Sequence, residues 1–328
     1  MAYIERQRGS AAAIPVTPDN FNQAESDLMF TDMVKDGAFG KFVHHREPPP
    51  LDFPVIRPNR DTLYSVAIFD LAAGPVTVTM PDAAGRFMSM QVVDEEQYAP
   101  AVYYGAGVHT LTRAAIGTRY VTVGIRTLVD LRDPGDVRQA HALQDAIRVA
   151  QPGGPGRFEP PRFDQVSQSK VREALLALAE TMTETRRAFG PRGEVDPIHH
   201  LIGTAMGFGG NPEKDALYLN VTPAANDGRT VYRLTAKDVP VDAFWSISVY
   251  DAHGHFRKND LDAYSLNNLT AVKDADGSVS VQFGGCEAGA APNCLPIMPG
   301  WNYLVRLYRP RPEILDGRWT FPEASPVH

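Results

Sequence analysis

The spacing of short β-type runs constrains the fold of this chain most. Runs rich in β-branched and aromatic residues are bounded by Gly, Pro and Asp, and they fall into two blocks. The first block contains 65–71, 76–80, 87–93 and 120–125, and the second contains 217–222, 230–235, 244–250, 279–283 and 303–308. The chain has 27 Gly and 27 Pro among 328 residues, which is typical of a turn-rich β protein. The pattern predicts two β-sandwich lobes, at about 55–127 and 217–308.

Helical periodicity separates the two blocks. Asp133-Pro134 and Asp196-Pro197 each indicate a helix start with proline at the first helical position, and 169–187 carries apolar residues at helical spacing. Before the first block, Thr17 is the expected N-cap of a helix that ends at Gly37. We therefore expect a mainly β fold with a helical middle.

Bulk properties exclude several classes of protein. The net charge is -7, the pI is about 5.7 and no basic run occurs, so nucleic acid is not the expected partner. No run of about 18 apolar residues occurs, so no membrane span is expected. Residues 1–8 lack the apolar core of a signal peptide, which predicts a cytoplasmic location for the chain as given.

The two cysteines qualify the prediction of location. Cys286 and Cys294 lie in one Gly-rich and Ala-rich loop. A disulfide between them would contribute roughly 2.5 kcal/mol on the chain-entropy model and would be compatible with the periplasm. Free thiols in a reducing cytosol are equally compatible with the sequence, whereas a zinc site would need ligands that the loop lacks.

The densest polar segment precedes the first β run. Asn59, Arg60, Asp61, Thr62 and Tyr64 lie within six residues, where the strand would bury part of them. Strand alternation would send Arg60, Thr62 and Tyr64 to one face, and Asn59, Asp61 and Leu63 to the other. A small sandwich core is a poor environment for these groups, so we expect the segment to face the second lobe.

Two motifs resemble a known bacterial family. They are Asn59-Arg60-Asp61-Thr62-Leu63-Tyr64-Ser65 and, in the second half, Phe244-Trp245-Ser246-Ile247-Ser248-Val249-Tyr250-Asp251 with Asn302-Tyr303. Together they resemble the family that pairs the domains of unknown function 1254 and 1214, over roughly residues 16–322. The resemblance implies an N-terminal β-sandwich, a helical insert and a C-terminal jelly-roll-like sandwich, with no settled activity. We therefore divide the chain into an N-terminal helix and crossing loop (1–54), an N-terminal β-sandwich (55–130), a helical middle (131–215) and a C-terminal jelly-roll-like sandwich (216–328).

Common catalytic and nucleotide-binding motifs do not occur in the sequence, and no motif indicates a particular cofactor. His253-Gly254-His255 has a spacing that places both rings on one face of a strand, but its surroundings favour an exposed turn, so we predict no metal site. Adjacent His199 and His200 cannot share a helix face, and a buried structural role for His200 is the simpler interpretation.

The candidate site combines the polar segment with aromatic and amide side chains. Asp61, Tyr64 and His200 are the candidate acid/base residues, because a carboxylate and a Tyr or His within hydrogen-bond reach can transfer a proton. The candidate ligand-binding residues are Asn59, Arg60, Asn211, Tyr218, Trp245, Tyr250 and Tyr264. A cleft between lobes lined by such groups suits a small polar molecule, although Trp245 is also a normal core residue.

Two functions are compatible with this site. The first is a hydrolase acting on a small molecule, and the second is a non-catalytic ligand-binding or cell-envelope-associated module. Inactivity towards ester, amide and glycoside substrates, without bound metal, would favour the second. In both cases the partner is a small-molecule ligand, and the family's jelly-roll lobe suggests a homo-oligomer.

Overall fold

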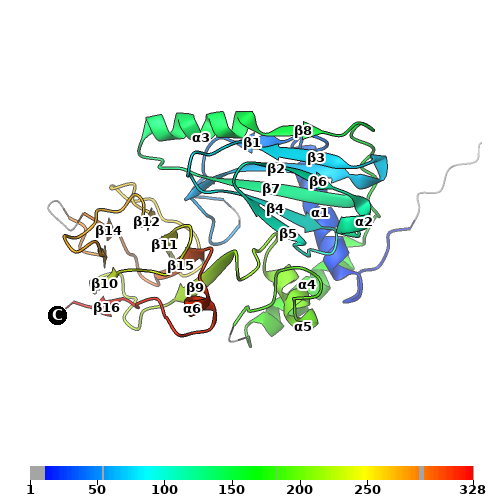
Figure 1. The fold of residues 1–328 in the computed structure, drawn as a ribbon. Coiled ribbons are helices and arrows are strands. Elements are labelled where there is room, and N and C mark those ends of the chain that lie inside the picture. Colours follow the sequence, from blue (N-terminus) through cyan, green and yellow to red (C-terminus); the bar gives the residue numbers. More distant parts are fainter. Residues whose placement is uncertain (1–11, 54, 183, 288–291, 328) are drawn as a thin grey trace, which may run out of the picture.

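The computed structural model describes residues 12–53, 55–182, 184–287 and 292–327. Within these ranges the chain forms sixteen β-strands in four sheets and six α-helices. Figure 1 shows two β-rich lobes side by side, with most of the helices against the N-terminal lobe. The expected fold class is therefore confirmed. The signal-peptide prediction concerns residues 1–8, which lie outside the described residues.

The N-terminal lobe is a sandwich of two sheets. The larger sheet has the order β1 (Val43–His45), β2 (Thr62–Asp70), β7 (Tyr120–Leu128), β4 (Met88–Asp94) and β5 (Ala101–Tyr104). The smaller sheet has the order β6 (Gly107–Leu111), β3 (Val76–Met80) and β8 (Arg148–Ala150), and all pairings in both sheets are antiparallel. Alternating side chains from both sheets, such as Val78, Met90 and Val123, fill the core between them.

The C-terminal lobe is also a two-sheet sandwich. One sheet has the order β14 (Cys294–Leu295), β13 (Val279–Phe283), β10 (Tyr232–Ala236) and β16 (Ser325–Pro326). The other has the order β12 (Ser265–Asn267), β11 (Trp245–Tyr250), β15 (Asn302–Tyr308) and β9 (Ala216–Val221). Phe283 stacks on Trp301 in the core, and a disulfide joins Cys286 to Cys294, which decides between the two states that the sequence left open.

Two of the longer helices follow the predicted starts, whereas α4 (Gln165–Ala179) begins four residues before the predicted 169–187 and also ends earlier. The side chains of Asp133 and Asp196 cap α3 (Pro134–Ala146) and α5 (Pro197–Met206). Helix α1 (Phe21–Lys35), however, begins at Phe21 and not after Thr17. The Thr17 amide donates to Asn20 Oδ1 over 2.8 Å, so residues 17–20 form a turn before the helix and the predicted N-cap was wrong.

Three helices form a separate packing unit beside the N-terminal sheet. Phe21 of α1, Leu175 of α4 (Gln165–Ala179) and Ile202 of α5 share one apolar cluster. The short helices are η1 (Leu71–Ala73), α2 (Arg113–Ile116) and α6 (Pro312–Leu315). Among the residues that the structure describes, no helix combines the length and the apolar character needed to cross a membrane.

A carboxyl pair is buried where α1 meets the sheet. Asp27 of α1 is 3% exposed, and Glu95 after β4 is 6% exposed. Burial, together with the charge and the hydrogen bond of Glu95, raises the pKa of Asp27 from 3.8 to about 8. Near neutral pH, Asp27 therefore keeps its proton in the folded protein and loses it on unfolding.

This pair predicts that the protein loses stability as the pH rises from about 4 to about 8. Because the folded pKa of Asp27 is the higher one, its contribution is fully present below the unfolded pKa and is lost as the pH passes the folded value near 8. We expect the free energy of unfolding to fall by up to about 1.4 kcal/mol per pH unit in this window. Urea unfolding of Asp27→Asn should show a smaller slope, with the rest supplied by other carboxyls of raised pKa such as Asp94, whereas the exposed control Asp32→Asn should retain the full slope. An unchanged slope in Asp27→Asn would contradict the assignment.

Candidate functional site

The polar segment of the N-terminal lobe contacts the C-terminal lobe, as the sequence predicted. Asn59 Nδ2 donates to Tyr308 Oη of β15 over 3.1 Å and to Tyr64 Oη of β2 over 3.2 Å. Ser246 Oγ of β11 donates to Asp61 Oδ2 over 2.6 Å. Asn59 and Asp61 thus connect the lobes through hydrogen bonds between side chains, of which the one from Ser246 to Asp61 is buried.

Arg306 of β15 extends this contact. Its side chain is only 2% exposed, and it donates to Ser248 Oγ and Tyr250 Oη, each over 2.8 Å, and to the carbonyl oxygen of Arg57 over 2.9 Å. Tyr250 in turn donates to the carbonyl oxygen of Pro58 over 2.8 Å. The guanidinium of the C-terminal lobe is therefore held by acceptors from both lobes.

The predicted alternation of the polar segment was wrong before Thr62. Strand β2 begins at Thr62, and Asn59 precedes it in a loop that turns back so that the Asn59 amide reaches both Thr62 Oγ1 and Tyr64 Oη. Leu63 packs under α3, as alternation requires. Strand periodicity does not extend into the preceding loop, so Asn59 lies with Tyr64 and not opposite it.

A second polar group lies on the same face of the five-stranded sheet. Arg126 of β7 is directly opposite Tyr64, and its guanidinium carbon is 5.5 Å from the centre of the Tyr64 ring. Arg126 Nη1 donates to Gln91 Oε1 over 2.7 Å and to Asn211 Oδ1 over 3.4 Å. The Asn211 amide then donates to Tyr218 Oη over 2.8 Å. These contacts join the sheet, the loop after α5 and strand β9 into one network.

Open space lies above Gly124 in the middle of β7. Val123 and Ile125 point into the sandwich core, so a Cβ on Gly124 would point to the face that carries Tyr64 and Arg126. Such a Cβ would meet no heavy atom within 4 Å. A glycine inside a central strand often marks a place where a ligand or another backbone approaches closely. No described atom fills that place here.

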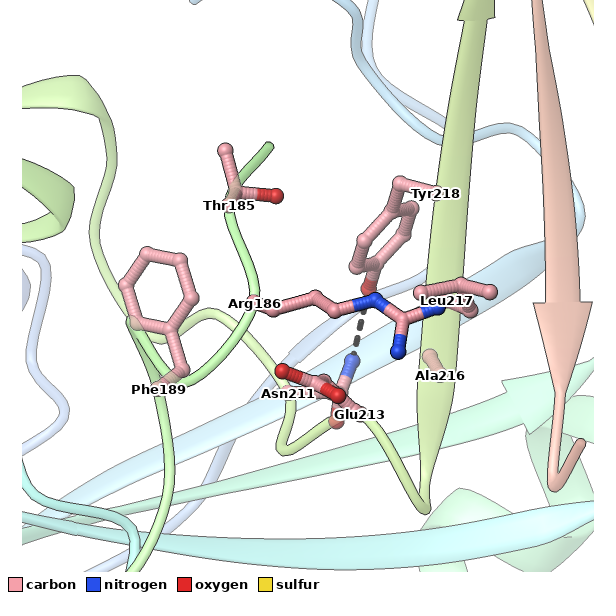
Figure 2. Close-up of a pocket in the computed structure, with 8 residues that line it drawn as sticks. All are labelled: Thr185, Arg186, Phe189, Asn211, Glu213, Ala216, Leu217 and Tyr218. Carbon is pink, nitrogen blue, oxygen red and sulfur yellow. Dashed lines mark hydrogen bonds between the residues drawn. The ribbon is translucent and has the colours of Figure 1, made fainter. Parts of the chain in front are cut away.

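Two hollows adjoin the lobe contact. A cavity of about 40 Å³ is lined by Thr185, Arg186, Phe189, Asn211, Glu213, Ala216, Leu217 and Tyr218. Figure 2 shows the Tyr218 hydroxyl pointing towards the Asn211 amide across this cavity. The space suits a few water molecules. An open groove of about 470 Å³, within the range of small-molecule sites, is lined by Leu51, Asp52, Phe53, His255, Phe256, Arg257 and Lys258.

The titratable residues at the contact between the lobes differ in the direction in which their pKa is shifted. Burial would raise the pKa of Tyr64, but the charge of Arg126 and hydrogen bonds with Asn59 and Thr62 outweigh it, so the pKa lies below the usual 10.0. Burial raises the pKa of Asp61 despite the opposing charge of Arg306. Burial and neighbouring phenols raise the pKa of Tyr308. Tyr64 is therefore the phenol at this contact with the lowered pKa, and it is the one best suited to proton transfer.

The structure brings together most of the predicted site residues, but not all of them. Asn59, Asp61, Tyr64, Asn211, Tyr218 and Tyr250 belong to the networks described above. Arg60 lies beside them, donates to the carbonyl oxygen of Pro49 and stacks over the ring of Tyr264 at 5.4 Å. Trp245 instead packs on Phe321 in the C-terminal core, away from these networks.

His200 also lies outside the group. It is 1% exposed in α5, and its two ring nitrogens lie 2.8 and 2.9 Å from the carbonyl oxygens of Ala188 and Glu96. The ring stacks on Tyr98 at 4.2 Å. These contacts are those of a buried structural histidine and do not bring His200 to Asp61.

The histidine pair His253 and His255 lies in a turn, where both backbone amides donate to Asp251 Oδ1. Across the described ranges, no three His, Cys, Asp or Glu side chains are grouped so that they could hold a metal ion.

Four residues of the contact were missed from the sequence: Gly124, Arg126, Arg306 and Tyr308. Arg306 did carry a signal, because a charge inside the apolar run 303–308 must find buried partners. Gly124 carried a weaker signal as a glycine within a strand pattern. Which face each residue occupies, and which partners it meets, depends on the packing of the two lobes.

The fold and the hydrogen bonds between the lobes define the class of this protein: two β-sandwich lobes joined through a buried polar interface. Residues 39–107 match the family model described as Protein of unknown function (DUF1254), and residues 217–312 match the one described as Protein of unknown function (DUF1214). The chain belongs to the family that pairs these two domains, as its motifs implied.

Solved structures of other proteins share this fold. The chain is similar to the VPA0106 protein from Vibrio parahaemolyticus, with 21% identity, a TM-score of 0.73 and coverage of 95% of this chain and 98% of that chain. It is also similar to an uncharacterised protein from Burkholderia cenocepacia, with 13% identity, a TM-score of 0.50 and coverage of 89% and 83%. No curated protein matches the chain. At these identities the likeness shows the fold alone.

The lowered pKa of Tyr64 gives a direct prediction. In a pH titration followed by the ultraviolet absorbance of phenolate, we expect one tyrosine to ionise below the usual pH, and Tyr64→Phe to remove that transition. Arg126→Gln should shift the transition to higher pH, because the favourable charge is lost. Tyr264→Phe, which removes a phenol with a raised pKa, should leave the transition in place. Persistence of the early transition in Tyr64→Phe would show that another phenol carries it.

The role of Arg306 can be tested by stability. We expect Arg306→Met to lower the free energy of unfolding by about 3–5 kcal/mol, because Asp61 and two hydroxyl groups lose a buried partner. The exposed control Arg233→Met on β10 should change it little. Asp61→Asn should cost less free energy of unfolding in the Arg306→Met background than in the wild type, because the positive charge that attracts Asp61 across the interface is already gone. Additive effects in this double-mutant cycle would contradict that coupling.

Proposed function

We propose that the protein binds a small molecule between its two lobes, on the sheet face that carries Tyr64, Gly124 and Arg126. The observation that carries this proposal is the open space above Gly124, beside a polar network drawn from both lobes. Interfaces between domains are preferred positions for ligand sites, and convergent polar groups beside open space are their usual composition.

The open groove supports the proposal less well. Its volume is sufficient, but Arg257 pairs with Asp251 over 2.6 Å, so part of its charge is already compensated. The groove is formed by loops, whereas Gly124, Arg126 and Tyr64 are on two central strands. Rigid elements hold binding groups more accurately than loops do.

Binding without catalysis is the function that the geometry supports best. In the hydrolase hypothesis Asp61, Tyr64 and His200 act together, but His200 is engaged by backbone carbonyls and Asp61 by Ser246. A catalytic role is favoured by one observation, the lowered pKa of Tyr64, which suits a proton-transfer residue. Hydrolysis is therefore the second candidate function, and it depends on Tyr64.

We also propose a compartment and an oligomeric state for the protein. The disulfide between Cys286 and Cys294 favours an oxidising compartment such as the periplasm over the cytoplasm. Self-association, suggested by the family's jelly-roll lobe, remains a prediction that light scattering would test.

The binding proposal can be tested by filling the open space. Valine at position 124 suits a central strand, so Gly124→Val should fold with an unchanged or higher melting temperature. We expect at least one compound from a panel of monosaccharides, amino acids, nucleosides and aromatic acids to raise the melting temperature of the wild-type protein but not that of Gly124→Val. Thr235→Val, on the outer sheet of the C-terminal lobe, is the matched control and should respond as the wild type does. If no compound distinguishes the wild type from Gly124→Val, the proposal is wrong.

A further inference from the structure

Arg126 differs from three other partly buried arginines near the N-terminal sheet. Each of those has a carboxylate partner, in the pairs Arg86–Asp136, Arg119–Asp70 and Arg172–Glu25. Arg126 has no carboxylate within ion-pair distance among the described residues; its hydrogen bonds go to the amide oxygens of Gln91 and Asn211 and to the hydroxyl of Tyr64. The neighbours that favour its charge are the phenols of Tyr64, Tyr218 and Tyr308. The guanidinium of Arg126 therefore has no carboxylate partner of its own, and a carboxylate would suit it as an additional acceptor.

Further donors converge near Arg126. A guanidinium has five N–H donors, and the two bonds from Nη1 leave others for an additional acceptor. The Tyr308 hydroxyl accepts from Asn59, and the Tyr218 hydroxyl accepts from Asn211, so each retains its own proton to donate. Glu213 is the carboxylate in the adjoining cavity, and it accepts the backbone N–H of Arg187. The network around Arg126 is thus rich in donors.

Building on the proposed function, we infer that the ligand carries a carboxylate, which Arg126 binds above the open backbone of Gly124. The planar fork of a guanidinium matches a carboxylate in geometry, and a single positive charge matches a single negative one. A phosphate carries more charge and is usually held by several cations or by a glycine-rich loop at a helix start. No glycine-rich loop at a helix start adjoins Arg126, because the glycines nearest to Asn211 follow helix α5 and do not precede a helix. The remainder of the ligand would lie over Gly124 and Val66, which are opposite each other on β7 and β2.

The inference predicts discrimination between charged and neutral isosteres. By isothermal titration calorimetry and ligand-observed NMR, we expect at least one of acetate, succinate and benzoate to bind the wild-type protein. We expect the neutral isosteres acetamide, succinamide and benzamide, and inorganic phosphate, to bind at least about tenfold more weakly. Binding of the carboxylate should weaken with added salt, because a charge pair carries it.

Variants of Arg126 and Gly124 test whether the carboxylate binds at the proposed site. Arg126→Gln should weaken binding of the carboxylate at least about tenfold, although its side-chain amide can still donate hydrogen bonds to its neighbours. Arg126→Lys keeps the charge without the planar fork and should give an intermediate affinity, which also covers the case that Arg126→Gln fails to fold. Gly124→Val should abolish binding. Arg46→Gln, which alters an arginine already paired with Asp145, is the control and should bind as the wild type does.

The outcomes separate this inference from the proposed function. If a neutral compound binds as tightly as its carboxylate and Gly124→Val blocks both, the site exists but the carboxylate assignment is wrong. If none of the three carboxylates binds the wild type, or if Arg126→Gln and Arg126→Lys both bind as the wild type does, the inference is overturned. If carboxylate binding depends on neither Gly124 nor Arg126, both the inference and the position of the proposed site fail.

Discussion

The buried guanidinium of Arg306 is the interaction on which the arrangement of the two lobes depends. A charge removed from water is tolerated only when acceptors surround it, and here they come from β11 and from the carbonyl oxygens of Arg57 and Pro58. Separating the lobes would leave that charge without half of its partners. The loop before β2 is therefore held against the C-terminal lobe, and this fixes the position of Asn59 beside Tyr64 and Tyr308.

The open space on the sheet results from how this face is covered. At one end of the strands, Phe30 and Met33 of α1 lie over Ile68 and Tyr120. At the other end, Tyr308 of the C-terminal lobe reaches Tyr64 through Asn59. Gly124 and Val66 lie between these two covers, and Gly124 contributes no side chain to fill the gap. A site at this position thus depends on both lobes and on α1, although its central residues belong to one sheet.

The sequence predicted the fold well where apolar runs were long. Strands such as β3 and β13 were predicted with their observed bounds, because alternation and flanking turns define them. The three-residue strands β1 and β8 were missed, because short polar edge strands carry little periodic signal. The contact of Asn59 and Asp61 with the second lobe was predicted because buried polar groups must find partners.

The composition of the candidate site was less predictable. Trp245 and Tyr250 were grouped as ligand-binding residues, yet they are five positions apart on one strand and so point to opposite faces. Trp245 enters the core with Ile247 and Val249, while Tyr250 meets Arg306. His200 was misplaced for another reason. Its carbonyl partners are 12 and 104 residues away, and no local pattern indicates them.

The proposed carboxylate ligand would affect the chemistry that is available to Tyr64 at the sheet face. A guanidinium lowers the pKa of the Tyr64 phenol, and the same charge would attract a carboxylate ligand. These two roles compete, because a bound anion would offset the charge that favours ionised Tyr64. With ligand present, Tyr64 would hold its proton and act as a hydrogen-bond donor rather than as a base. A carboxylate at Arg126 therefore favours recognition over hydrolysis at this site, and a catalytic role for Tyr64 would be that of an acid.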